Sequence, residues 1–153
     1  MEIRVRREIA ASAQRVWDVV TDLEGSVEVL SAVEHIERLD DLAEFGVGTR
    51  WRETRTMFGR QATEELRVTA ADPPRGYTVV ADSGSTVYTS TLAVTPLEGQ
   101  RCELEMSFAG ESSGVVGRLL AATLGRLFAG STRKALQQDL DDLAQHAELH
   151  EAG

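Results

Sequence analysis

The chain of 153 residues is long enough for one domain with a substantial core and too short for two ordinary domains. Its net charge of -9 disfavours binding to nucleic-acid phosphates and insertion into anionic membranes, so neither is an expected partner. The single cysteine, Cys102, excludes an internal disulfide framework and fits a reducing cytoplasm. No signal-peptide core or membrane-length apolar run is found, and the single lysine among 16 basic residues suggests a GC-rich bacterial genome.

The first 30 residues predict one strand followed by two short helices. Apolar residues alternate with charged ones between positions 3 and 9, which is the period of a half-buried strand. Ser12 can cap a helix whose buried stripe contains Val16, Trp17 and Val20. A second, short helix is expected between residues 22 and 30, although Gly25 weakens it.

The middle of the chain, from about residue 33 to residue 111, predicts about six further strands. Turn signals separate them at Gly46-Val47-Gly48, Gly59, Asp72-Pro73-Pro74, Ser83-Gly84 and Glu98-Gly99. Apolar and polar residues alternate cleanly from Cys102 to Phe108, so this strand has one buried and one solvated face. We therefore expect an antiparallel sheet that needs a cover on one side.

After Gly114 the apolar period becomes helical and continues to Ala147 through Leu136, Leu140 and Leu143. This long helix is expected to cover the sheet, which gives an α+β fold of about seven curved strands around a C-terminal helix. Such a sheet leaves space beneath the helix, where small-molecule sites are usually found. We interpret Asp139, Asp141 and Asp142 as a solvated helix face.

The order of elements and several local patterns resemble the START-like (SRPBCC) superfamily, and within it the polyketide cyclase/dehydrase and lipid-transport group. The resemblance covers almost the whole chain, and its matching residues are Ile9-Ala10-Ala11-Ser12 before Val16-Trp17 and Asp22, Gly46-Val47-Gly48-Thr49-Arg50-Trp51, Asp72-Pro73-Pro74 and the Leu136, Leu140, Leu143 helix. It implies a single domain, residues 1–153, with a helix-grip fold and a cavity for an apolar or polycyclic molecule. The second short helix departs from the group, since relatives often place an aromatic there and this chain has Gly25-Ser26-Val27-Glu28.

A candidate polar site follows from pairing the strands on either side of Gly59. A two-residue turn pairs odd positions before it with even positions after it, so Glu53 and Arg55 share a face with Glu64. The same face carries Trp51 and Leu66, which favours an inward orientation, and the two possible registers place Glu64 opposite either Glu53 or Arg55. Charges on an apolar face need partners or a wet cavity. The alternative is that these strands curl and leave the charges in solvent at the sheet edge.

The leading hypothesis is a binding protein or enzyme for a small hydrophobic, aromatic or polycyclic molecule. The expected apolar wall consists of Trp51, Leu66, Tyr88, Met106, Phe108 and Leu120, and the candidate catalytic residues are Glu53, Arg55 and Glu64. If the protein is an enzyme, cyclisation or dehydration fits, with a carboxylate that moves a proton and Arg55 beside an enolate. The alternatives are a carrier or sensor of a lipid-like ligand, or a partner-binding module similar to chaperone activators. No metal or cofactor is expected, and the protein is expected to be a monomer or homodimer.

Overall fold

The computed structural model describes residues 2–57, 59–82, 86–112 and 115–151, without the side chains of residues 57, 111, 112, 115–129, 150 and 151. Within these ranges, seven strands and three helices follow one another along the chain. Their order is β1 (Glu2–Ile9), α1 (Ala13–Thr21), α2 (Ser26–Val29), β2 (Val33–Arg38), β3 (Arg50–Met57), β4 (Arg60–Asp72), β5 (Gly76–Asp82), β6 (Thr86–Leu97), β7 (Arg101–Ser112) and α3 (Val115–Glu151).

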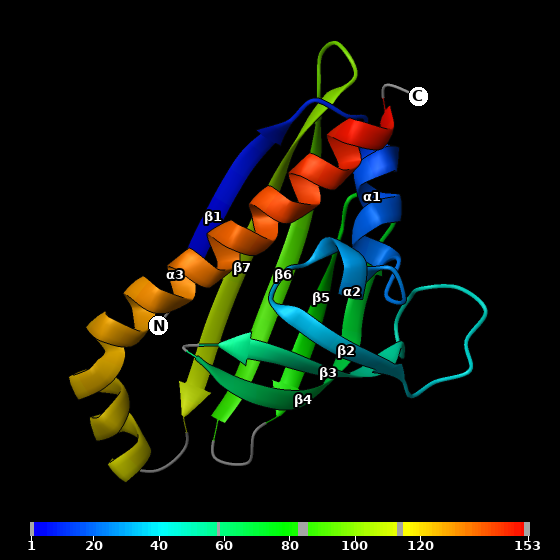
Figure 1. Ribbon diagram of the computed structural model, residues 1–153. Helices are drawn as coiled ribbons and strands as arrows, with labels where there is room; N and C mark the ends of the chain where they lie inside the picture. Colours follow the sequence, from blue (N-terminus) through cyan, green and yellow to red (C-terminus); the bar gives the residue numbers. More distant parts are fainter. Residues whose placement is uncertain (1, 58, 83–85, 113–114, 152–153) are drawn as a thin grey trace.

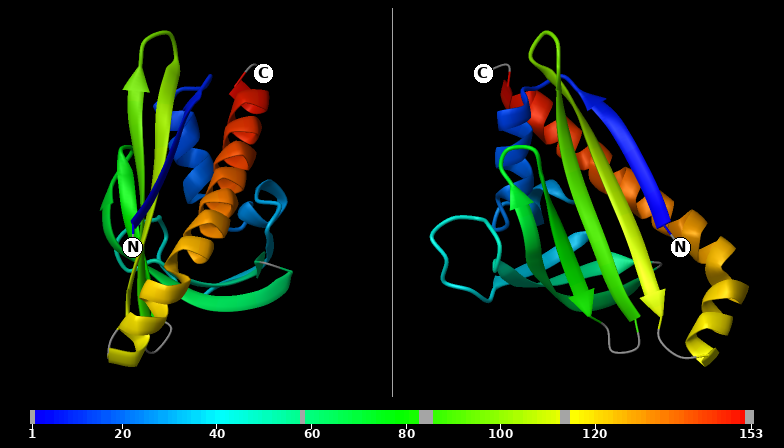
Figure 2. Two further views of the ribbon diagram at one scale, coloured as in Figure 1. Left: turned by 90° about the vertical axis from the view of Figure 1, so that its left-hand side faces the viewer. Right: turned by 180° about the vertical axis from the view of Figure 1, so that it is seen from behind.

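The strands form one antiparallel sheet in the order β1-β7-β6-β5-β4-β3-β2. The sheet is strongly curved, and all three helices lie on its concave side, with α3 running diagonally across it (Figure 1). Figure 2 shows from the edge how β3 and β4 swing out beneath α3. The expected α+β helix-grip fold, with two short helices after the first strand, is confirmed.

The local signals in the sequence explain where the first elements begin and end. The Ser12 side chain accepts a hydrogen bond from the Arg15 backbone N–H, so it caps α1 as predicted. The α1 stripe of Val16, Trp17 and Val20 is buried against the sheet and α3. In β1, Ile3, Val5 and Ile9 are buried between exposed charged residues, as their alternation predicts.

The C-terminal half of α3 is packed tightly against β1, β7 and α1. Leu140, Ala144 and Ala147 are fully buried in the same core cluster as Ile9 and Leu104. Polar links hold the outer edge of this contact, because Arg7 of β1 pairs with Asp141 of α3 at 2.9 Å. None of the helices in the described part of the chain is long and apolar enough to cross a membrane.

Candidate functional site

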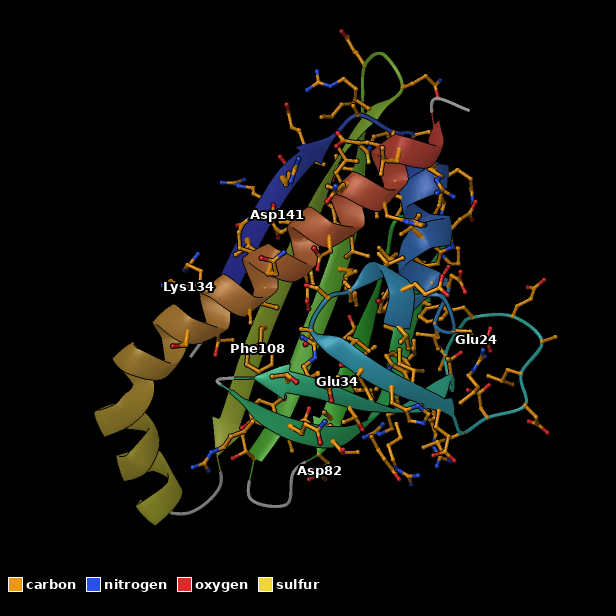
Figure 3. All side chains as sticks on the ribbon, in the orientation of Figure 1. Glu24, Glu34, Asp82, Phe108, Lys134 and Asp141 are labelled. Carbon is orange, nitrogen blue, oxygen red and sulfur yellow. The ribbon has the colours of Figure 1, made fainter. Side chains whose placement is uncertain are left out.

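A cavity of about 530 Å³ lies between the concave face of the sheet and the middle of α3. Its walls come from β2 to β7, from α1 and α2, and from five positions on one side of α3, namely Thr132, Ala135, Leu136, Asp139 and Leu143. Figure 3 shows Phe108 of β7 between α3 and β3, whereas Lys134 lies on the side of α3 away from β3. The curvature of the sheet therefore keeps this part of the helix from packing directly on the strands.

Five of the six residues predicted for the apolar wall line this cavity. They are Trp51, Leu66, Tyr88, Met106 and Phe108. The rings of Tyr88 and Phe108 stack with centroids 5.3 Å apart, because the β6–β7 register places Tyr88 beside Gly110 and Ser90 opposite Phe108. The side chain of Leu120, the sixth residue, lies outside the described part of the chain.

The β3–β4 register is the one in which Glu64 lies opposite Glu53, with Trp51 opposite Leu66. All four residues line the cavity, as expected for one shared face. Their burial differs along the hairpin, because Trp51 is buried whereas Glu64, nearer the turn, is exposed. The side chains of Glu53 and Arg55 are only 16% and 18% exposed, so they lie inside the cavity, whereas the exposed Glu64 lies where it opens to solvent.

Arg55 lies between two carboxylates that come from different elements. Its Nε donates to Glu53 Oε2 at 2.9 Å within β3, and its Nη1 donates to Asp139 Oδ2 at 3.0 Å on α3. Burial lowers the pKa of the Arg55 guanidinium, but the charges of Asp139 and Glu53 outweigh this effect and hold the pKa above its usual range. Arg55 is therefore a permanent cation that ties the sheet to the helix across the cavity.

Asp139 corrects the interpretation of the three aspartates as a solvated face. Asp141 and Asp142 are partly exposed, but Asp139 is only 3% exposed. Burial raises the pKa of the Asp139 carboxyl above its ordinary value, and the attraction to Arg55 offsets this only in part. The sequence did contain a signal, since Asp139 follows Leu136 by three residues and precedes Leu143 by four, on the apolar side of the helix.

Three polar atoms in the cavity wall are buried without a hydrogen-bond partner among the described residues. They are Trp51 Nε1, Thr132 Oγ1 and Asp139 Oδ1. A buried polar group without a partner costs about 1–3 kcal/mol, so such groups are rare in a purely structural core. Their presence, together with the Arg55 cluster, distinguishes this end of the cavity from ordinary packing.

Tyr77 of β5 is a cavity residue that the sequence analysis did not single out. It is 8% exposed, and its ring lies against Phe45 at 4.8 Å and Trp17 at 6.1 Å between centroids. Burial raises the pKa of the Tyr77 phenol, and the nearby charge of Glu53 raises it further. Its alternation with Val79 and Ala81 was the available signal, since it places all three on the buried face of β5.

The short helix α2 forms part of the cavity wall where the sequence departs from the related group. Ser26 and Leu30, at the two ends of this segment, line the cavity. The following residue, Ser31, is held against α3, because both its backbone N–H and its hydroxyl donate to Asp142 Oδ2. Small and aliphatic side chains thus stand at this wall, supported by a polar contact between α2 and α3.

Solved structures of similar fold cover almost the whole chain. The crystal structure of TTHA0849 from Thermus thermophilus has a TM-score of 0.77 and 22% identity, covering 96% of this chain and 97% of that one. Zhui aromatase/cyclase from a Streptomyces species has a TM-score of 0.73 and 18% identity, covering 97% and 93%. Norcoclaurine synthase from Thalictrum flavum, solved with dopamine and hydroxybenzaldehyde, has a TM-score of 0.74 and 19% identity, covering 98% and 87%.

At these identities the structural likeness establishes the fold alone. No curated protein matches the sequence. The family described as "Polyketide cyclase / dehydrase and lipid transport" matches residues 1–148, which is nearly the full chain. This confirms the resemblance drawn from the sequence patterns: the chain belongs to the polyketide cyclase/dehydrase and lipid transport family of the SRPBCC superfamily.

Proposed function

We propose that the protein binds a small hydrophobic molecule, aromatic or polycyclic, in the cavity beneath α3. The observation that carries the proposal is a cavity of about 530 Å³ with apolar walls and one cluster of buried charges. Ligand sites have this size, roughly 300–1,000 Å³, and this pattern of mostly apolar walls with a few placed polar groups. Trp51, Leu66, Met106 and the stacked pair Tyr88 and Phe108 form the apolar contact surface, and Leu120 is proposed to extend it.

The charged residues are proposed to orient the ligand and, if chemistry occurs, to move its protons. Arg55 uses Nε and Nη1 for its two carboxylates, and no described residue hydrogen-bonds to Nη2. The free edge of a guanidinium can stabilise an enolate oxygen, while Glu53 or Glu64 accepts or returns a proton. Cyclisation or dehydration of a carbonyl compound is the reaction class that fits these groups.

The binding proposal is tested with the neutral dye N-phenyl-1-naphthylamine, whose fluorescence rises in apolar surroundings. We expect about one equivalent to bind to the folded protein, and A135W to prevent binding, because Ala135 lines the cavity. The matched control is K134W, since Lys134 is exposed on the neighbouring position of α3. Equal dye binding by A135W and K134W, with both variants folded, would refute the site.

An enzyme and a carrier differ in whether the bound molecule is released chemically changed or unchanged. Native mass spectrometry of the purified protein identifies a co-purified molecule. The mass of this molecule is then compared before and after incubation with the protein. In an enzyme, E53Q is expected to abolish turnover while the ligand still binds. In a carrier, the molecule is released unchanged and E53Q leaves the affinity for an apolar ligand nearly the same.

A further inference from the structure

The Tyr77 hydroxyl is placed differently from the other unpartnered polar groups of the cavity. Trp51 Nε1, Thr132 Oγ1 and Asp139 Oδ1 are enclosed by protein, whereas the Tyr77 hydroxyl is not among these enclosed atoms. No described residue forms a hydrogen bond with it. Tyr77 lines the cavity, is otherwise buried and lies close enough to Glu53 of the cavity wall to be affected by its charge, so its hydroxyl is expected to face the space that a ligand would fill.

Two aromatic rings contact the Tyr77 ring, and the backbone just before Tyr77 lies close to β6. Trp17 of α1 and Phe45 of the β2–β3 loop contact it edge to face, at interplanar angles of 75° and 66°. The preceding residue, Gly76, lies so close to β6 that an added Cβ would be 2.3 Å from the Leu92 carbonyl oxygen. A glycine is thus needed at this strand start, where the backbone that carries Tyr77 lies against β6.

The neighbouring charges indicate what kind of group the phenol meets. Among the described residues, the cavity wall carries three carboxyl groups, Glu53, Glu64 and Asp139, and two guanidinium groups, Arg55 and Arg60. Burial raises the pKa of the Tyr77 phenol, and the charge of Glu53 raises it further. The phenol therefore stays protonated, and its hydroxyl is a hydrogen-bond donor. This described part of the wall has no excess of positive charge, which favours a neutral acceptor over an anion.

We propose that Tyr77 is a specificity-determining residue, whose hydroxyl donates a hydrogen bond to a neutral carbonyl oxygen of an aromatic ligand at the buried end of the cavity. The inference rests on the proposed binding function and adds to it the class of ligand, an aromatic ketone. It also assigns a direction to the bound molecule: the carbonyl lies toward Tyr77 and Trp17, and the apolar part lies toward Tyr88 and Phe108. An exposed tyrosine would not orient the ligand in this way, because water would form hydrogen bonds with both the hydroxyl and the carbonyl.

Three naphthalenes of similar shape separate the hydrogen bond from the apolar contact. They are 2-ethylnaphthalene, which has no acceptor, 2-acetylnaphthalene, which has a neutral one, and 2-naphthoate, which has an anionic one. We expect the wild-type protein to bind the ketone about three- to tenfold more tightly than the hydrocarbon, as for one neutral hydrogen bond. The carboxylate is expected to bind more weakly than the ketone.

The Y77F variant is expected to lose this preference for the ketone and to keep its affinity for 2-ethylnaphthalene. Y88F is the matched variant, because it removes the only other phenol of the chain, and it should change the affinity for the ketone and the hydrocarbon by the same factor. An unchanged ketone preference in Y77F, or a tighter binding of 2-naphthoate than of the ketone, would overturn the assignment. Failure of the wild-type protein to bind 2-ethylnaphthalene would instead refute the cavity site itself, and the Tyr77 proposal with it.

A spectroscopic readout keeps the proposal testable even if Y77F is unstable. The infrared stretch of a ¹³C-labelled carbonyl in 2-acetylnaphthalene is expected to shift to lower frequency on binding to the wild-type protein. In Y77F it should return to the frequency seen in an apolar solvent. A wild-type frequency equal to that in the apolar solvent would show that the carbonyl receives no hydrogen bond.

Discussion

The layer between the sheet and α3 consists of a solid half and a hollow half. In the solid half, Leu140, Ala144 and Ala147 are fully buried against the strands and α1. In the hollow half, Thr132, Leu136, Asp139 and Leu143 face a cavity of about 530 Å³. One continuous helix serves both, so the difference lies in the side chains and in the curvature of the sheet.

The contrast shows how a small fold can hold a cavity beside a tightly packed core. Two alanines in the last turns let α3 approach the sheet and α1 closely, and dispersion contacts there stabilise the fold. In the hollow half, the ion pair of Arg55 with Asp139 connects β3 to α3 across the cavity. Substitutions and pH are expected to affect the two halves differently, and the largest effect is expected at Arg55.

Removal of Arg55 is expected to have the largest effect on stability. R55M leaves Asp139 and Glu53 inside the protein without their cation, and breaking such a buried pair typically costs about 3–5 kcal/mol. The loss should be greatest at neutral pH and decrease in acid, as the Asp139 carboxyl becomes protonated. Urea denaturation measures it, and the double variant R55M/D139M should recover much of the loss. A cost below about 1 kcal/mol, the range of exposed ion pairs, would show that the cluster is solvated.

Replacing an alanine of α3 by leucine is expected to affect stability differently in the two halves. A144L is expected to destabilise the protein by about 1–3 kcal/mol, since overpacking strains a full core. A135L adds the same atoms earlier on α3, where they enter the cavity, so it should cost little stability and weaken dye binding. Thermal unfolding and dye titration of both variants give the answer. Similar destabilisation by the two substitutions would mean that the space beneath Ala135 is not available.

The pH dependence of stability reports on Asp139. Because its folded pKa lies above the ordinary value of 3.8, the folded state binds the proton more tightly than the unfolded state. The resulting stabilisation is complete below the unfolded pKa and is lost as the pH rises through the folded pKa. Wild-type stability should therefore fall relative to D139N as the pH is raised from about 4 to about 7. A difference that stays constant across this range would contradict the raised pKa.

Most of the fold could be predicted from the sequence because its signals are local. Alternation in β1 and β7, the Ser12 cap and the glycine turns each constrain a few neighbouring residues. The hairpin at Gly59 even limited the β3–β4 register to two choices, both of which bring Glu53, Arg55 and Glu64 onto one face. The choice between the two registers depends on the turn geometry, which the sequence pattern left open.

The site was predicted less completely because its main contacts are between elements distant in the chain. Arg55 and Asp139 are separated by 84 positions, and no local pattern pairs them. Asp139 was interpreted as solvated because aspartate beside Asp141 and Asp142 is usually exposed, although its spacing from Leu136 and Leu143 indicated otherwise. Tyr77 was missed for a related reason, since its partners Trp17 and Phe45 come from a helix and a loop far away along the chain.

The central claim, that the hollow half is a ligand site, is tested most directly by intermolecular nuclear Overhauser effects between methyl-labelled protein and bound 2-ethylnaphthalene. Cross-peaks are expected from the methyl groups of Leu66, Met106 and Leu136, which line the cavity. The methyl groups of Ile9, Leu104 and Leu140, which are fully buried in the solid half, should show none. Cross-peaks confined to exposed methyl groups such as those of Val47 and Leu149 would contradict the claim and place the hydrocarbon on the surface.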